Sequence, residues 1–222
     1  VVTTIFELSE AVIRQISMKD WCCLVVADKA TPESLQLATE NYSNVDLLTV
    51  SQQETLRTIS FVDKIPWNHF GRKNIGYLYA VRNGAEQIWG FDDDNLLLRP
   101  VPDYQQNPSV LTYLPYSSSH LLNLYPTMGA SESPSWPRGF PLLKIKSNDS
   151  VPYLSLPMKI RSKSIGVILS LANGDPDVDA IFRMTGNIPF EFSGEHLFLL
   201  PKSKFMPLNA QATLFYRNSF WM

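Results

Sequence analysis

Three consecutive carboxylates follow a short apolar run in the segment IWGFDDDNLLL, residues 88–98. Side chains alternate along an extended chain, so Asp92 and Asp94 are expected on one side and Asp93 on the other. Two oxygen ligands from one segment suit Mg²⁺ or Mn²⁺, which complete their coordination with water and substrate phosphate. We therefore predict Asp92 and Asp94 as metal ligands, and a solvated acidic turn is the alternative.

Other motifs of common sites are missing from the sequence. DPDVDA places Asp175, Asp177 and Asp179 at positions 1, 3 and 5 of an EF-hand loop, but Ala180 stands where position 6 requires Gly. Three His residues without H-E-x-x-H spacing, and no C-x-x-C, argue against zinc. The sequence also has no G-x-S-x-G elbow, no Walker A loop and no G-x-G-x-x-G.

Strands and helices alternate in the part of the chain that must position the aspartates. The expected strands are short apolar runs at residues 21–27, 45–51 and 86–91. The expected helices are one capped by Thr31, one at 52–59 and one at 71–84 that closes in a left-handed cap at Gly84. This order predicts an α/β domain with parallel strands, in which ligands gather beyond the carboxyl ends of the strands.

The second half of the chain differs from the first in its composition and in its pattern of apolar residues. Pro and Ser are frequent from about residue 100 to 157 and no period is sustained, which favours a long functional loop assembly over a linker. Regular elements are expected again after it: a helix over 164–173, a strand over 195–201 and mixed loop and strand over 209–221.

Composition limits the possible classes of protein. The 222 residues suit one large domain slightly better than two small ones. The formal net charge of −2, with no run of Lys or Arg, argues against a nucleic-acid partner. The longest apolar run, 21–27, is too short to span a bilayer, and the chain does not begin with Met, so we interpret it as a fragment of a longer protein.

The stretch PWNHFGRKNIGYLYAVRNGAEQIWGFDDDN resembles the signature of the STELLO family of Golgi glycosyltransferases. WPRGFPL, DPDVDAIFR and MPLNAQATLF follow in the same order, and the family pattern continues beyond Met222, so C-terminal truncation is expected. The resemblance implies one nucleotide-diphospho-sugar transferase domain of the GT-A type, an α/β fold with a central, mostly parallel mixed sheet flanked by helices. Its nucleotide-binding half would span about 20–100 and its acceptor-side half about 101–222, with Asp92, Asp93 and Asp94 as the D-x-D motif.

The resemblance also implies Mn²⁺ or Mg²⁺, a UDP-sugar donor and an unknown glycan or protein acceptor. It implies a Golgi lumenal domain behind an N-terminal membrane anchor that lies outside this chain. Two alternatives stay open. WPRGFPL also resembles the Arg-containing stretch of self-glycosylating plant nucleotide-sugar mutases, in which an Arg, here Arg138, carries the sugar. The domain could otherwise be a catalytically silent scaffold for cellulose synthase-like partners.

In the first half, the resemblance and the residue types suggest a nucleotide site. Asp28 closes the first strand and resembles the acid that contacts the nucleobase or ribose, with a capping turn aspartate as the alternative. Arg72 and Lys73 lie at a predicted helix N-terminus, where they would neutralise the diphosphate or form a solvated basic end. Asn74 would hydrogen-bond the nucleotide or cap the helix, and Asp93 is grouped with the residues that bind the nucleotide sugar.

In the second half, the predicted roles are on the sugar and acceptor side. Trp136 beside Arg138 suits sugar stacking and a bidentate anion contact, or else a Pro-fixed aromatic corner of the core. Asp177 and Asp179 are candidate catalytic carboxylates, one of which would deprotonate an acceptor hydroxyl, or else helix caps. The neutral residues predicted to bind sugar hydroxyls, or to bond within a turn, are Asn209 and Gln211.

Overall fold

The computed structural model of the chain divides into two compact units. It describes residues 1–56, 60–101, 111–145, 151–153, 158–159, 165–194 and 197–220. Unit 1 contains the described residues up to 101, residues 166–168 and the residues from Ala210 onward. Unit 2 contains the remaining described residues.

The first sheet of unit 1 is parallel, as the alternation of strands and helices predicts. It consists, in spatial order, of β1 (Val2–Thr3), β2 (Cys23–Val26) and β3 (Val45–Leu48). All four residues of β2 are buried, as expected for an apolar strand covered on both faces. The strands expected at 21–27 and 45–51 are therefore confirmed with shorter bounds.

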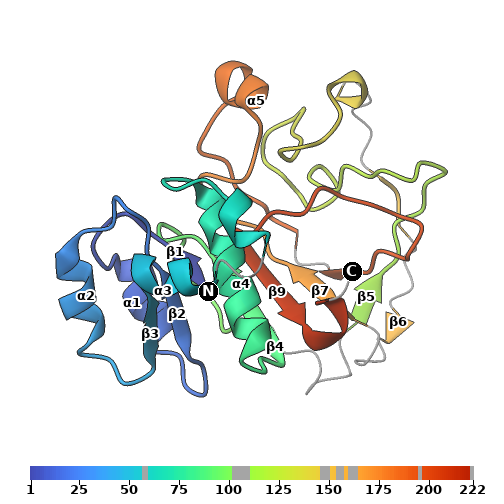
Figure 1. Cartoon of the computed structure of the whole chain (residues 1–222). Helices are drawn as coiled ribbons and strands as arrows, with labels where there is room; N and C mark the ends of the chain where they lie inside the picture. Colours follow the sequence, from blue (N-terminus) through green and yellow to red (C-terminus); the bar gives the residue numbers. More distant parts are fainter. Residues whose placement is uncertain are drawn as a thin grey trace. The chain divides into compact units, whose positions relative to one another are not determined.

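The second sheet has the order β4 (Gln87–Phe91), β9 (Ala212–Tyr216) and β7 (Val167–Leu169) (Figure 1). β4 and β9 are antiparallel. β4 also contacts Val1, the residue before β1: the Val1 nitrogen donates to Trp89 O at 2.6 Å, and Phe91 N donates to Val1 O at 3.2 Å. The spacing of these two bonds around Trp89 and Phe91 is the one found between parallel strands, and it is limited to Val1.

The helix predicted over 164–173 was wrong. The described part of this segment contains the strand β7, and Ile168 is buried. Its β-branched residues, Val167 and Ile168 among them, fit a pleated sheet better than a helix. The partner strand β9 lies more than forty residues further along the chain, and so a local pattern could not reveal the pairing.

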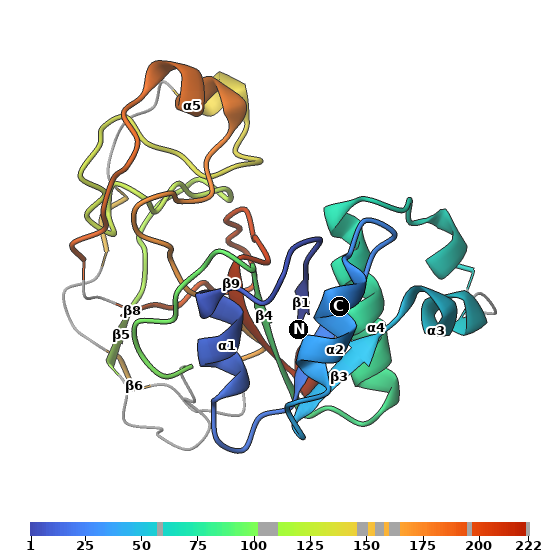
Figure 2. The same ribbon diagram turned by 90° about the vertical axis from the view of Figure 1, so that its left-hand side faces the viewer.

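Helices lie on both faces of the strands in unit 1 (Figure 2). Trp89 of β4 donates to Gln15 of α1 (Glu10–Ile16), whereas Gly90, the next residue, lies under Tyr77 of α4 (Lys73–Arg82). Successive residues of a strand face opposite ways, so α1 and α4 cover opposite faces. The described residues of unit 1 also form α2 (Glu33–Thr39), α3 (Val50–Thr55) and the short 3-10 turns η2 (Val62–Lys64), η3 (Phe70–Arg72) and η6 (Arg217–Ser219).

Helix boundaries match the predictions unevenly. The helix predicted at 71–84 is confirmed as α4, and Gly84 follows it with a φ of +83°, the left-handed conformation that glycine favours. Thr31 as an N-cap was wrong. Pro32 occupies that position, and the Thr31 hydroxyl donates instead to the carbonyl of Thr4 at 2.7 Å. The helix expected at 52–59 is α3, which begins earlier because Thr49 caps it; residues 57–59 lie outside the described chain.

Unit 2 is largely irregular, as predicted for the Pro- and Ser-rich region. The regular elements among its described residues include β5 (Leu111–Tyr113), β6 (Met158–Lys159), β8 (Leu197–Phe198), η4 (Leu142–Lys144) and α5 (Ala180–Thr185). The strand expected at 195–201 is represented by β8, and residues 195 and 196 lie outside the described chain. The core of unit 2 is an aromatic cluster that includes Tyr125, Trp136, Phe140, Phe182 and Phe190.

Candidate functional site

The three aspartates lie in a tight turn that begins where β4 ends. The amide of Asn95 donates to the carbonyl of Asp92 at 3.2 Å, and Phe91 is the last residue of the strand. The predicted alternation of the three side chains assumed an extended chain, so that reasoning was wrong for this segment. The turn follows the carboxyl end of β4, so the predicted place of the aspartates directly after this strand is confirmed.

Lys73 contacts this turn from the first residue of α4. Its ammonium donates to Phe91 O at 2.5 Å, to Asp92 Oδ1 at 2.7 Å and to Ala210 O at 2.7 Å. The Lys73 side chain is 6% exposed and that of Asp92 is 47% exposed. Burial lowers the pKa of Lys73, while Asp92, and more weakly Asp93 and Asp94, favour its charged form. A solvated basic helix end is therefore excluded for Lys73.

Two hydroxyls hold the turn from the N-terminal part of the chain. Thr4, directly after β1, donates from Oγ1 to Asp93 Oδ2 at 2.5 Å. Ser9 donates to the carbonyl of Asp93 and also caps α1, where it accepts from Val12 N at 3.2 Å. Sequence reasoning missed both residues. The pattern of Ser9 before an apolar helical stretch could have revealed the cap, but nothing in the sequence indicates the contact of Thr4.

The carboxylate oxygens of the acidic turn fit a hard divalent cation that takes its other ligands from a bound diphosphate or from water. Asp92 is half-exposed and Asp94 is exposed, and both offer carboxylate oxygens. Within the part of the chain that the structure describes, no three His, Cys, Asp or Glu side chains lie close enough together to hold a metal by themselves. A metal at this turn would therefore need further ligands from a diphosphate or water, which is how Mg²⁺ commonly binds.

Asp28 lies at the end of β2 and organises the loop that leads into α4. Its Oδ1 accepts from the amides of Lys29 and Asn68 at 2.7 and 2.8 Å, and Oδ2 accepts from His69 N at 3.2 Å. Asn68 has a φ of +54°, which a non-glycine residue rarely adopts, so these bonds stabilise an unfavourable backbone conformation. The contacts of Asp28 are those of the capping aspartate that was the alternative interpretation.

Arg72 is buried, with 1% of its surface exposed. Its guanidinium donates to Gln53 Oε1 from Nε and Nη2 at 3.1 and 2.5 Å, and to Ile65 O from Nη1 at 3.1 Å. It also stacks 3.6 Å above the ring of Trp67. Gln53 in turn donates to Ala27 O and to the carbonyl of the last residue of β3. Arg72 thus ties the start of α4 to the carboxyl ends of β2 and β3, beside a small cavity of about 130 Å³.

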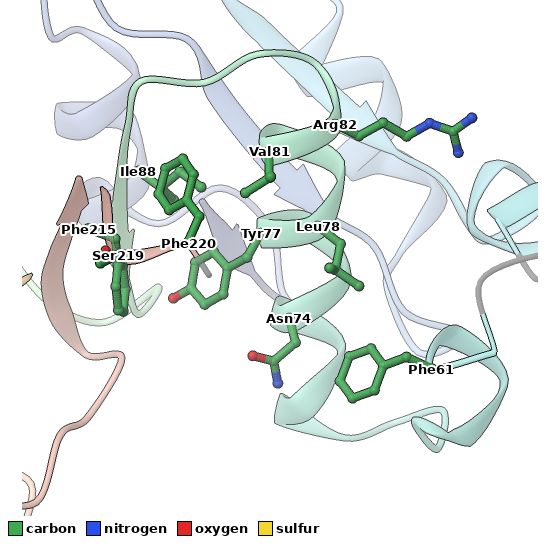
Figure 3. Close-up of a pocket in the computed structure, with 10 residues that line it drawn as sticks. All are labelled: Phe61, Asn74, Tyr77, Leu78, Val81, Arg82, Ile88, Phe215, Ser219 and Phe220. Atoms are coloured by element: carbon green, nitrogen blue, oxygen red, sulfur yellow. The ribbon is translucent and has the colours of Figure 1, made fainter. Parts of the chain in front are cut away.

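A larger cavity lies on another side of α4 (Figure 3). Its volume is about 560 Å³, and aromatic and aliphatic side chains dominate its wall, among them Phe61, Tyr77, Phe215 and Phe220. Asn74 is the one predicted site residue in this wall, and its amide donates to Gly71 O at 3.1 Å. None of the described residues that line the cavity is acidic, and none of them is an aspartate of the turn.

The segment that enters β9 lies beside the acidic turn, as its contacts show. Ala210 O accepts from Lys73, and Gln211 O accepts from the amide of Asp92 at 3.2 Å. The structure therefore brings Gln211 to the turn through its backbone. Asn209 is half-buried and belongs to unit 2.

In unit 2 the structure brings together four predicted residues from two distant segments. Pro137 and Val178 form an antiparallel bridge, so that residues 136–138 lie against 177–179. Arg138 Nε lies 2.7 Å from Asp177 Oδ1, and the Arg138 amide donates to the carbonyl of Asp177 at 3.0 Å. The side chains of Arg138 and Asp177 are 62% and 16% exposed, which makes Arg138 the accessible charge of this pair.

The other two residues of this cluster are structural in their contacts. Asp179 caps α5 by accepting from Phe182 N at 2.8 Å, and its other oxygen accepts from Trp136 Nε1 at 2.5 Å. The Trp136 ring is buried and packs edge-on against Phe182, with ring centroids 5.2 Å apart. These contacts match the alternatives of a helix cap and an aromatic corner of the core.

Comparison with known proteins gives two curated relatives, and no family model matches the chain. The chain is 26% identical to "Probable glycosyltransferase STELLO2" and to "Probable glycosyltransferase STELLO1", both of Arabidopsis thaliana. Each match covers 93% of this chain and 28% of the relative, so the chain spans just over a quarter of these proteins. The two matches confirm the resemblance to the STELLO family. No helix among the described residues is long and apolar enough to cross a membrane.

Proposed function

We propose that this chain, a relative of the STELLO proteins, is the glycosyltransferase domain of a metal-dependent enzyme with a GT-A type fold. The enzyme would move a sugar from a nucleotide-diphosphate sugar, of the UDP class, to an acceptor hydroxyl. The observation that carries this proposal is the acidic turn after β4. Its carboxylates are fixed by Lys73 from one side and by Thr4 from the other, while Asp92 stays half-exposed.

In this proposal the turn acts on the leaving group. The bond between the anomeric carbon and the diphosphate breaks, a bond to the acceptor oxygen forms, and the nucleoside diphosphate leaves. Asp92 and Asp94 would hold Mn²⁺ or Mg²⁺, which supplies positive charge against the developing charge of the diphosphate. Gln211, whose backbone accepts from the Asp92 amide, would contact the donor beside the turn.

The proton of the acceptor hydroxyl needs a base, and unit 2 offers one candidate. Asp179 uses both oxygens within the fold, whereas Asp177 lies beside the exposed guanidinium of Arg138. We therefore assign the acceptor side to unit 2 and the proton to Asp177. The nucleotide side is assigned to unit 1, where Asp28, Arg72 and Asn74 shape the loop and the helix next to the turn.

A second candidate function rests on one observation. The Arg138 side chain is 62% exposed and could be reached by a nucleotide sugar, as in a self-glycosylating mutase.

A silent scaffold is the third candidate, and it needs no half-exposed aspartate held by a buried lysine. For the whole protein we extend the proposal to a lumenal Golgi domain, which protease protection in microsomes would test.

Turnover tests the proposal directly. A panel of nucleotide sugars would be incubated with the protein in Mn²⁺ or EDTA, and released nucleoside diphosphate would be measured. We expect release that requires Mn²⁺ and falls about 100-fold in Asp92→Asn, the loss typical when a metal site is disturbed. Asp46→Asn, an exposed aspartate on β3, is the matched control and should keep full activity. Release that is indifferent to EDTA and to Asp92→Asn would contradict the proposal.

A further inference from the structure

We propose that Lys73 is a positioning residue, which fixes the aspartates of the turn and does not itself bind the diphosphate. This inference rests on the proposed function and changes the role expected for a lysine at the start of a helix. In this role Lys73 affects the binding of the donor indirectly, because it fixes the positions of Asp92 and of the backbone of the turn.

The first argument is the number of donors. An ammonium group has three N–H donors and no acceptor. The three donors of Lys73 go to Phe91 O, Asp92 Oδ1 and Ala210 O, at 2.5, 2.7 and 2.7 Å. A diphosphate could gain a hydrogen bond from Lys73 only if one of these bonds broke. One of the acceptors is the carbonyl of Phe91 at the buried end of β4, where an unpaired acceptor is costly.

The second argument is what those acceptors belong to. Phe91 is the last residue of β4, Asp92 opens the turn, and Ala210 precedes β9. One ammonium therefore fastens the exit of one strand to the entry of its antiparallel neighbour. These segments are distant in sequence, and Lys73 reinforces the backbone bond from Asp92 N to Gln211 O that also joins them.

The third argument is the rigidity of the helix that carries Lys73. One turn further on, Gly76 lies so close to β2 that an added Cβ would be 2.5 Å from Val26 Cγ2. This contact fixes α4 against the sheet, so Lys73 is held at a set distance from the turn. On the far side, Thr4 and Ser9 hold Asp93. Positioning from two sides suits carboxylates that must be in place before a ligand arrives.

The inference predicts how UDP binding responds when the ammonium is removed. For Lys73→Met, UDP affinity in EDTA should stay within about twofold, because no direct contact is lost. The factor by which Mn²⁺ tightens UDP should fall to near one, because the loss of a partner of a metal ligand weakens metal binding by about 10- to 100-fold. Lys73→Arg, which keeps the charge, should recover part of that factor. A lysine that binds the diphosphate would instead lose UDP affinity in EDTA, and that result would overturn the inference.

A measurement on the unchanged protein covers the case in which Lys73→Met does not fold. Lysines would be acetylated with and without UDP and Mn²⁺, and modified sites would be read by mass spectrometry. Exposed Lys64 should react in both conditions, and Lys73 in neither. Rapid labelling of Lys73, or labelling that UDP suppresses, would overturn the inference. Failure of the proposed function would look different, because the unchanged protein would then show no Mn²⁺-dependent UDP binding at all.

Discussion

The indole nitrogen of Trp136 donates a 2.5 Å hydrogen bond to Oδ2 of Asp179, and the two residues are 43 positions apart. The other oxygen of Asp179 accepts from Phe182 N at 2.8 Å and caps α5. Both oxygens of this carboxylate are thus used to join two segments of unit 2. A carboxylate in this position stabilises the fold, whereas Asp177 beside it pairs with the exposed guanidinium of Arg138.

The stability of variants separates these two carboxylates. Asp179→Asn cannot accept from both Trp136 and Phe182, so we expect it to lower the free energy of unfolding by about 1 to 3 kcal/mol. Asp177→Asn is the matched control and weakens an ion pair to an exposed Arg138, for which about 0 to 1 kcal/mol is expected. Urea unfolding measures both. Equal costs would show that the assignment of Asp179 to the fold is wrong.

Gly76 tests the contact between α4 and the sheet. Alanine is favoured over glycine in a helix by about 1 kcal/mol. The new Cβ would nevertheless lie 2.5 Å from Val26 Cγ2, and overpacking of this kind costs about 1 to 3 kcal/mol. We expect Gly76→Ala to lower the melting temperature, and Arg82→Ala, exposed at the end of α4, to leave it nearly unchanged. A more stable Gly76→Ala protein would refute the close approach of α4 to β2.

Tyr77 carries a hydroxyl that lies over Gly90, where an added Cβ would be 2.2 Å away. This oxygen is buried, and the described residues provide no hydrogen-bond partner for it. Removing such a group relieves a desolvation cost of about 1 to 3 kcal/mol, so Tyr77→Phe should raise the free energy of unfolding. Tyr125→Phe is the contrasting control. The Tyr125 hydroxyl donates to the carbonyl of Asp177 at 3.0 Å, and its loss should destabilise the protein.

The same tyrosine gives a pH dependence. Burial raises the pKa of Tyr77 above its ordinary value of 10.0, and Asp92 raises it further. Above pH 10 the unfolded chain therefore loses a proton that the folded chain keeps, and stability falls as the pH rises. We expect this alkaline loss to be smaller in Tyr77→Phe, as measured by urea unfolding between pH 9 and 11. An unchanged slope would mean that Tyr77 titrates normally in the fold.

Local patterns in the sequence were sufficient for the elements next to the acidic turn. The strand before Asp92, the helix from Lys73 and the left-handed cap at Gly84 follow from apolar runs and from glycine placement, and the structure confirms them. These features depend on neighbours a few positions apart. The location of the aspartates at a strand end could be predicted for the same reason.

Features that depend on distant partners could not be predicted in this way. β7 pairs with β9, and this pairing made a strand of residues expected to be helical. The burial of Arg72 depends on Gln53 and Trp67, which no spacing rule connects to it. The contact of Thr4 with Asp93 spans 89 positions. In each case tertiary contacts, which the local sequence does not contain, decide the role of the side chain.

Arg138 distinguishes ordinary transfer from self-glycosylation. We expect the intact mass of the protein to be unchanged after incubation with UDP-sugars, because the proposed base Asp177 pairs with Arg138 and the sugar goes to a separate acceptor. A mass increase of one hexose or pentose, lost in Arg138→Lys, would support the mutase in place of the transferase. Intact-mass spectrometry reads either outcome directly.

The central claim is that Asp92 and Asp94 bind a metal together with a nucleoside diphosphate, and calorimetry of UDP binding tests it most directly. We predict that Mn²⁺ tightens UDP by about tenfold or more, within the usual range of coupling between sites, and that UDP tightens Mn²⁺ by the same factor. Asp94→Asn should abolish this coupling and leave the fold intact. Asp93→Asn should do less, since an amide oxygen can still accept from Thr4. Equal UDP affinity in Mn²⁺ and in EDTA would contradict the claim and leave these carboxylates as a solvated turn.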